Sequence, residues 1–371
     1  METDITARAA ARAAEDGYDR LDRQLAQALQ LDARAPFSRI AEVLGVSDQT
    51  VARRYARLRD RGSVRVLGLS EATALGEVRW HVRVQCIPGA APAVADALAR
   101  REDTTWVSLG SGGAEINCTT RAHPDAQQDS LLLQRLPRTP SVVGVSAHCV
   151  MHTYFGGAHS IALKSGALSP EQVATLRPGG LPSPVGPAGG PAVGAAADPA
   201  VGLAVGPGSV GVDDADRRLF EVLAVDGRAG LTELAAATGW SASTVRRRMA
   251  ELEAADVLYF DLDMDWRIFG IRNATLLWLS VAPAELDATG AALAEHPEVA
   301  YACATTGPTN LHAVVLTSDV QGFYTYLTTR IAALPAVRQV ETAPVMRNVK
   351  GPGPVALPLR GAHRPLRRAR S

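Results

Sequence analysis

The apolar and polar residues around position 50 follow the repeat of an α-helix. One helical face collects the apolar side chains Val51, Tyr55 and Leu58. Ser47 stands just before this run, where its hydroxyl can accept a hydrogen bond from an unpaired backbone N–H and start the helix. Gly45 predicts a tight turn after a shorter helix. Because Val64–Gly68 is expected to form a short β-wing, residues 18–68 predict a winged helix-turn-helix.

The same pattern returns around position 245, with Gly239 and Ser241 in the places of Gly45 and Ser47. The face opposite the apolar stripe carries hydroxyl, amide and guanidinium groups in both copies. Arginine neutralises phosphates and reads guanine, and small hydroxyls permit a close approach to the DNA backbone. The candidate DNA contacts are Ser47, Gln49, Thr50, Arg53, Arg54 and Arg57, and in the second copy Ser241, Ser243, Thr244, Arg246, Arg247 and Arg248. We interpret both helices as recognition helices; for either copy alone, a solvated surface helix is the alternative.

After each helix-turn-helix the hydrophobic period changes from 3.6 to 2, which predicts strands. The elements then follow in the order β-α-β-β-α-β, which is typical of a ferredoxin-like fold. The first set is expected at residues 79–86, 92–101, 104–109, 114–120, 125–136 and 142–151, and the second at 275–281, 284–295, 299–305, 311–317, 320–333 and 337–346. Helices cover one face of such a sheet, so the other face is expected to meet a second domain of the same kind.

Residues at a constant separation indicate an internal duplication. Asp22 matches Asp216 and Arg34 matches Arg228, in each case 194 positions later. The sequence therefore predicts an α+β chain with two winged helix-turn-helix domains and two ferredoxin-like (βαββαβ) effector domains in tandem. The expected divisions are a disordered N-terminus (1–17), a winged helix-turn-helix (18–68), an effector and dimerisation domain (76–156), a disordered Gly/Pro/Ala linker (165–212), a second winged helix-turn-helix (213–262), a second effector domain (270–350) and a basic disordered tail (351–371).

Composition narrows the function classes. The 371 residues include 38 Lys and Arg against 38 Asp and Glu, so the formal net charge is zero. This balance argues against nonspecific coating of nucleic acid and permits local basic patches. The four cysteines form no C-x-x-C pair and are expected to be buried, reduced thiols. Because no run approaches 18 apolar residues, we expect a cytoplasmic, soluble protein.

Several short motifs occur in the same order in both copies. The first copy has Leu21-Asp22, then Arg34, Phe37 and Ile40-Ala41, then Val46–Arg54 and Gly112; the second has Arg228, Leu231 and Leu234-Ala235, then Ser241–Arg248, Gly307, Leu334–Val337 and Lys350. In these motifs the chain resembles the leucine-responsive regulator/AsnC (Lrp/AsnC) family of bacterial transcription factors. The resemblance implies a DNA-binding regulator modulated by an amino acid or other small metabolite. Two copies per chain imply an intramolecular pseudo-dimer, with higher homo-oligomers open and no cofactor.

The resemblance also places the effector near the glycine-bearing hairpins, where two effector domains meet. The residues at those positions are Gly112, Gly113 and Glu115, and in the second half Thr306, Gly307, Thr309 and Asn310. Two departures bear on this site: Asn310 replaces an acidic residue that would pair with an ammonium group, and Phe155 replaces the closing lysine that the second half retains as Lys350. Ordinary hairpin turns are the alternative interpretation.

Two further kinds of site were weighed. His148 and His152 stand four apart on an expected strand, on the same face, with His81 as a candidate neighbour. A metal site would need a third ligand in a fixed place, so we expect interface histidines and no metal. Proteins of this architecture also resemble siroheme decarboxylases, which act on a tetrapyrrole. The expected His- and Arg-rich segments are not found and no catalytic set stands out, so a non-enzyme is predicted, with this enzyme and a DNA-free interaction protein as alternatives.

Overall fold

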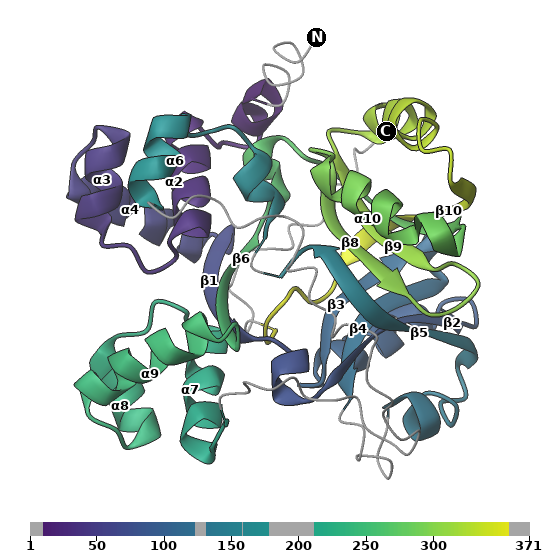
Figure 1. The fold of residues 1–371 in the computed structure, drawn as a ribbon, viewed down its shortest axis with the longest axis horizontal. Coiled ribbons are helices and arrows are strands. Elements are labelled where there is room, and N and C mark those ends of the chain that lie inside the picture. The colour runs from purple at the N-terminus through teal and green to yellow at the C-terminus, as the bar shows by residue number, and fades with distance from the viewer. Residues whose placement is uncertain (1–9, 123–130, 158, 178–210, 356–371) are drawn as a thin grey trace, which may run out of the picture.

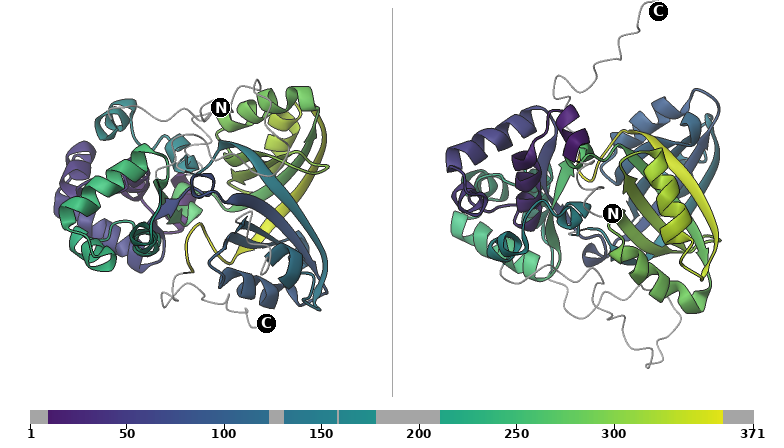
Figure 2. Two further views of the ribbon diagram at one scale, coloured as in Figure 1. Left: turned by 60° about the horizontal axis from the view of Figure 1, so that its bottom comes forward. Right: turned by 90° about the horizontal axis from the view of Figure 1, so that it is seen from above.

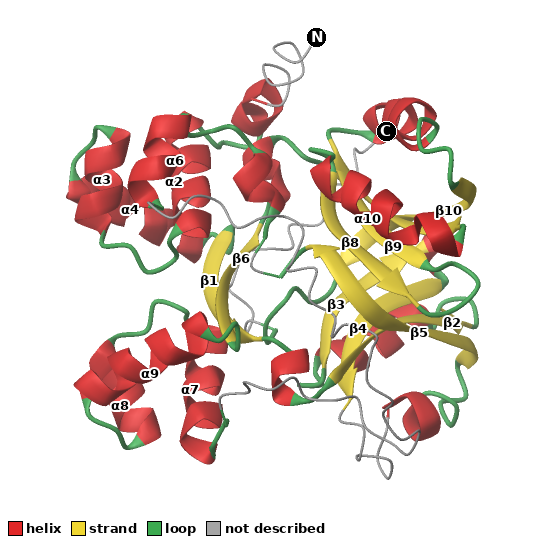
Figure 3. Cartoon of the chain, in the orientation of Figure 1, coloured by secondary structure: helices red, strands yellow, loops and turns green. Residues whose placement is uncertain are grey.

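The computed structural model describes residues 10–122, 131–157, 159–177 and 211–355. Two helical units lie together on one side of the molecule, and the sheets lie on the other (Figure 1). Figure 2 shows the same separation from two further directions, and Figure 3 shows that a short two-stranded ribbon stands between the helices and the larger sheets. No helix in the described part of the chain is long and apolar enough to cross a membrane.

The first helical unit is a helix-turn-helix with one further helix before it. Its helices are α2 (Arg20–Leu31), α3 (Phe37–Leu44) and α4 (Asp48–Asp60). Gly45 adopts a left-handed conformation with φ of 67° and makes the predicted turn. Ser47 caps α4, because its hydroxyl accepts a hydrogen bond from the backbone N–H of Thr50. The core contains the fully buried side chains Leu25, Leu29, Ile40 and Leu58.

The second unit repeats this construction. Its helices are α7 (Asp214–Val225), α8 (Leu231–Thr238) and α9 (Ala242–Ala254). Gly239 is left-handed with φ of 78°, and the Ser241 hydroxyl accepts from the backbone N–H of Thr244. The predicted apolar stripe is buried, since Val245, Met249 and Leu252 are at most 5% exposed. Both predicted recognition helices therefore exist, each fixed by its own small core.

The two expected wings form one shared ribbon. β1 (Val64–Ser70) pairs antiparallel with β6 (Leu258–Met264), and Leu67 lies opposite Asp261, its own counterpart in the duplication. The strand predicted at residues 64–68 is therefore present, and its partner is the equivalent strand of the other half. An isolated strand leaves its N–H and C=O groups unpaired, and the equivalent strand of the other half satisfies them. The ribbon accordingly lies across a pseudo-two-fold axis.

A reciprocal pair of arginines also joins the two helical units. Arg34 donates to the carbonyl oxygens of Gly227 (2.5 Å) and Ala229 (2.9 Å). Arg228 makes the matching bonds to the carbonyl oxygens of Ala33 (2.5 Å) and Ala35 (2.9 Å). Each arginine bonds the segment that contains the other arginine. The two helical units, called heads below, are therefore held in one mutual orientation.

The two effector domains close into a single barrel. The first contains β2 (Val78–Cys86), α5 (Ala91–Ala99), β3 (Thr104–Gly110), β4 (Glu115–Ala122) and β5 (Val142–Phe155), and the second contains β7 (Asn273–Val281), α10 (Leu286–Glu295), β8 (Val299–Thr305), β9 (Leu311–Thr317), α11 (Val320–Tyr326) and β10 (Val337–Asn348). The eight strands follow the order β10-β3-β4-β2-β5-β8-β9-β7. The halves are thus joined at both edges, through β5–β8 and β10–β3. Part of the helix expected at 125–136 lies outside the described residues.

The N-terminal segment, expected to be a frayed helix or disordered, and the linker, expected to be disordered, both contain helix. Residues 10–15 are helical, and Arg12 donates to the carbonyl oxygen of Ser318 at 2.7 Å. Within the expected linker, α6 (Pro170–Leu176) packs on α2 and α3. The physical reason lies in its sequence: Ser169 and Gln172 form a capping box, Pro170 fits the first helical turn, and Leu176 is 2% exposed in the core of the first unit. Residues 1–9, 178–210 and 356–371 of the expected termini and linker lie outside the described residues.

Candidate DNA-binding and ligand-binding sites

The outer faces of α4 and α9 are open to solvent. Ser47, Gln49 and Arg53 are exposed on the first helix, and Thr50 is half-buried. On the second, Ser241, Ser243, Arg246 and Arg247 are exposed and Thr244 is half-buried. Arg247 also pairs with Glu251 one turn further along its own helix. Arg57 of the first helix is exposed as well, so it belongs with these side chains to the part of the predicted DNA-binding set that a duplex can reach.

Three of the predicted arginines, Arg54, Arg57 and Arg248, also hold the recognition helices in place. Arg57 and Arg54 bind the buried carboxylate of Asp22, at 2.6 and 3.2 Å. Arg248 binds the equally buried Asp216 at 2.7 and 2.9 Å. These bonds tie each recognition helix to the first helix of its own unit. A signal for this role exists in the sequence, since an Asp stands 32 residues before an Arg in both copies.

The first hairpin candidate is closed by an internal ion pair. Gly112 and Gly113 lie in the turn between β3 and β4, with φ of 74° and 87°. Glu115 is 6% exposed and accepts hydrogen bonds from Nε and Nη2 of Arg83, each at 3.1 Å. Arg83 also binds Glu341 of β10 at 2.9 Å. The Glu115 charge is therefore paired within the protein.

The second hairpin candidate packs against the first half. The Asn310 amide binds both backbone groups of Val281, at 2.9 and 3.0 Å. Thr306 accepts from the backbone N–H of Cys149, and its carbonyl accepts from His148 Nδ1, each at 2.9 Å. A Cβ on Gly307 would lie 2.7 Å from His148 Nδ1. The Thr309 carbonyl accepts from the Thr305 hydroxyl at 3.1 Å.

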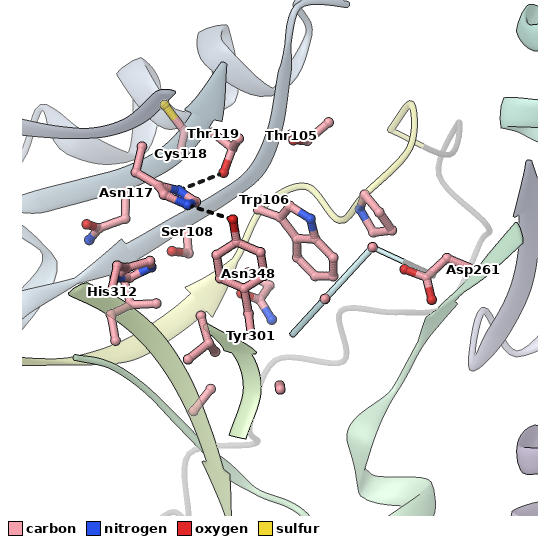
Figure 4. A pocket seen from close by; sticks show the side chains of 18 of the residues that line it. Thr105, Trp106, Ser108, Asn117, Cys118, Thr119, Asp261, Tyr301, His312 and Asn348 are labelled. Atoms are coloured by element: carbon pink, nitrogen blue, oxygen red, sulfur yellow. Dashed lines mark hydrogen bonds between the residues drawn. The ribbon is translucent and has the colours of Figure 1, made fainter. Parts of the chain in front are cut away.

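A cavity lies where the barrel meets the β1–β6 ribbon (Figure 4). The centre of a water molecule can range over about 180 Å³ of it. The first half contributes mostly polar side chains, among them Arg79, His81, Ser108, Asn117, Thr119 and Arg121. The second half contributes mostly apolar and aromatic ones, among them Leu276, Trp278, Tyr301, Val314 and Leu316, and the ribbon adds Leu69, Tyr259, Asp261 and Leu262. None of the seven predicted effector residues is among those that line this cavity.

Two histidines in the barrel are buried in their neutral form. His81 lies between the hydroxyls of Thr119 (3.1 Å) and Tyr301 (3.2 Å). Burial, followed by the neighbouring His312 and Arg79, holds the His81 pKa well below its usual range. Burial also lowers the pKa of His312 to about 3. Both imidazoles are therefore uncharged at neutral pH and serve as polar groups in the wall.

The predicted common face of His148 and His152 was wrong. His148 lies opposite His81 in the β2–β5 register, and the centroids of its ring and the Trp278 ring are 4.8 Å apart. The register of β5 shifts between Val150 and His152, and His152 contacts the Tyr154 ring. A bulge of this kind turns the following side chains to the other face. Among the described residues, no three His, Cys, Asp or Glu side chains could together hold a metal ion.

Comparison with known families identifies the repeated units. The AsnC-type helix-turn-helix domain matches residues 19–59 and again residues 212–253, and the Lrp/AsnC ligand binding domain matches residues 275–355. The chain is a tandem-duplicated Lrp/AsnC protein. A curated relative, the HTH-type transcriptional regulator FL11 of Pyrococcus horikoshii, is 25% identical over 142 residues, which are 38% of this chain and 93% of the relative. The domain composition of this Lrp/AsnC protein is that of a DNA-binding regulator.

A solved enzyme shares the architecture of this Lrp/AsnC protein. The siroheme decarboxylase NirDL aligns with a TM-score of 0.57 and 12% identity over 89% of this chain and 92% of that one. Its complex with an iron-uroporphyrin III analogue aligns with a TM-score of 0.55 over 86% and 87%. The prediction of a non-enzyme is therefore corrected, because an enzyme has the same fold over most of both chains. The prediction had relied on the lack of His-rich segments in the sequence. That reason does not hold, because strands far apart in sequence bring His81, His148 and His312 together.

Proposed function

We propose that this Lrp/AsnC protein is a cytoplasmic transcriptional regulator that binds one DNA site with both heads of the same chain. The proposal rests on the way in which the two heads are joined. The β1–β6 ribbon and the reciprocal hydrogen bonds of Arg34 and Arg228 relate them by a pseudo-two-fold axis. A two-fold pair of recognition helices fits two half-sites about one helical turn apart. Because the exposed residues of α4 and α9 differ, the operator is less palindromic than that of a homodimer.

We further propose that a small molecule in the cavity sets the orientation of the heads. Leu69 and Asp261 of the ribbon and Trp278 of the barrel line the same space, so a ligand there contacts both parts. The segment after β5 extends this contact to the first head. Ile161 lines the cavity, and the same segment continues into α6, which packs on α2 and α3. The segment after β10 reaches the second head in a similar way, because Pro352 lines the cavity and a Cβ on Gly353 would lie 3.2 Å from the carbonyl oxygen of Ala224 in α7. A ligand in the cavity is therefore expected to be coupled to both heads.

Arg53→Ala and Arg247→Ala test the DNA-binding faces. Each is expected to weaken binding to the protein's own upstream DNA about tenfold and to reduce the salt slope by about one, because one phosphate or guanine contact is lost. Fluorescence anisotropy at several salt concentrations measures both quantities. Arg100→Ala, which removes an exposed charge next to α5, is the matched control. Equal affinities for all three variants would contradict the assignment of these helices to DNA.

A tetrapyrrole function is a second candidate, supported by the neutral His81 and His312 beside Trp278 in a cavity whose fold is shared with NirDL. Titration of the purified chain with siroheme, followed by absorption spectroscopy, tests it. A saturable shift of the Soret band, lost in His81→Ala, would support the enzyme. An unchanged spectrum at a several-fold excess of siroheme would remove this candidate and leave the regulator.

A further inference from the structure

We infer that the cavity between barrel and ribbon takes an organic cation, an amine carried on an aromatic body, with Asp261 as its counter-ion. The inference rests on the proposed function, since it names the chemical class of the effector for the same cavity. Three independent features of the lining support it: its unequal walls, its aromatic rings and its unbalanced charge.

The two walls of the cavity differ in polarity although the duplication relates them. His81, Thr119 and Arg121 of the first half correspond to Leu276, Val314 and Leu316 of the second, and all six line the cavity. A ligand that satisfies both walls must have a polar side and an apolar side. Because the space lies across the pseudo-two-fold axis, one molecule fills it.

Aromatic side chains surround the end of the cavity nearest the ribbon. Figure 4 shows the Trp106 ring between the side chains of Tyr301 and Asp261. Trp106 has φ of 51°, a conformation that is costly for a bulky residue and that concentrates at functional sites. The backbone is held there by a bond from the Trp106 N–H to the Gly351 carbonyl at 3.0 Å. Rings of this kind attract ammonium groups through their negative faces.

The cavity also contains an acid without a cationic partner. The guanidinium of Arg79 binds Glu71, and Arg121 bonds Ser70 at 3.1 Å. Asp261 accepts from the backbone N–H of Leu262 at 2.8 Å, and in the described part of the chain it forms no ion pair. Burial, opposed in part by that bond and by a hydrogen bond with the side chain of Gln30, raises its pKa to about 7. An ammonium group beside Asp261 would supply the missing charge, whereas an anion would face the carboxylate.

The pH dependence follows from the groups that face Asp261. The backbone N–H of Leu262 and the side chain of Gln30 bond the carboxylate, and Asp263 is the charged group that acts on it. The other ionisable groups of the lining are Tyr259, Arg79, Arg121 and His159. Burial raises the pKa of Tyr259 to about 12, so its hydroxyl keeps its proton between pH 6 and 8, and burial lowers the pKa of His159. Asp261, with a pKa of about 7, titrates in this window. A cation that needs the ionised acid should bind about tenfold more weakly at pH 6 than at pH 8.

The test uses the full chain with phenethylamine, and with phenylacetate and 2-phenylethanol as the anionic and neutral counterparts. Calorimetry, or the fluorescence of Trp106, Trp266 and Trp278 in the cavity, measures binding. Phenethylamine is expected to bind with a dissociation constant below about 1 mM and at least tenfold more tightly than phenylacetate. Tighter binding of phenylacetate, or no binding of phenethylamine at pH 8, would overturn the inference.

Asp261→Asn separates this role from a structural one. The variant keeps the shape of the side chain and should lose at least tenfold in phenethylamine affinity together with the pH dependence. Asp263→Asn removes the same charge two residues away, where the acid pairs with Arg65, and should leave the affinity unchanged or slightly tighter. Equal affinity of Asp261→Asn and the parent chain would overturn the assignment. DNA binding without ligand is measured in parallel: intact DNA binding with no amine binding refutes the ligand class alone, and amine binding without DNA binding refutes the regulator alone.

Discussion

Arg34→Ala is expected to lower the free energy of unfolding by about 3 kcal/mol and to weaken DNA binding at least tenfold. The substitution removes two charge-assisted hydrogen bonds, to the carbonyls of Gly227 and Ala229, and each such bond contributes about 1.5–3 kcal/mol. The freed carbonyls lie in the segment between α7 and α8. Because that segment positions the second head, the two recognition helices lose their fixed mutual orientation. Chemical denaturation and anisotropy with operator DNA measure the two effects.

Two variants make this prediction specific. Arg228→Ala should have a similar effect, since it removes the mirror-image bonds to Ala33 and Ala35. Arg20→Ala, an exposed arginine at the start of α2, should change stability by less than about 0.5 kcal/mol. If Arg34→Ala retained full stability and affinity, the ribbon alone would be sufficient to orient the heads, and the reciprocal arginines would be dispensable.

The local elements could be predicted from the sequence because local patterns determine them. The stripe of Val51, Tyr55 and Leu58, the Ser47 cap and the Gly45 turn each act within one or two helical turns. The constant offset between the halves revealed the duplication. The shared ribbon and the closure of the barrel could not be predicted in the same way. They depend on which strand edges meet, and residues such as Leu67 and Asp261 carry no local signal of that pairing.

The cavity was not predicted from the sequence, and the reason is physical. The polar face of β2, with Arg79 and His81, alternates with an apolar face and therefore suggests solvent exposure. In the barrel this polar face points inward and meets the apolar wall of the second half, where Trp278 lies. The alternation of residues in β2 does not indicate that the second half covers its polar face. Likewise, nothing in the sequence around Asp261 indicates that its strand borders the cavity between the ribbon and the barrel.

Asp22→Ala is expected to destabilise the first head by about 4 kcal/mol, and Asp216→Ala the second head by about 3 kcal/mol, within the range for removing one partner of a buried ion pair. Asp22 is fully buried, closes the capping box of α2 and binds both Arg54 and Arg57. Asp216 has the same place but a single arginine, Arg248. Hydrogen exchange of each head measures the two losses separately. The recognition helices should lose their anchorage in the same order.

The pH dependence of this effect has a definite sign. Burial acts to raise the pKa of Asp216, but the bonds from Arg248 and from the backbone N–H of Asp213 outweigh it, and the pKa lies below its usual range. Such a group stabilises the folded state above the unfolded pKa of about 4, and this contribution is lost as the pH falls towards the lower folded pKa. The difference in stability between the parent chain and Asp216→Asn should therefore be constant from pH 5 to 7 and shrink below pH 4. Asp214→Asn, an exposed acid in the same turn of α7, should show little difference at any pH. A gap between parent and Asp216→Asn that stayed constant down to pH 3 would mean that packing, and not the charge on Asp216, holds α9 in place.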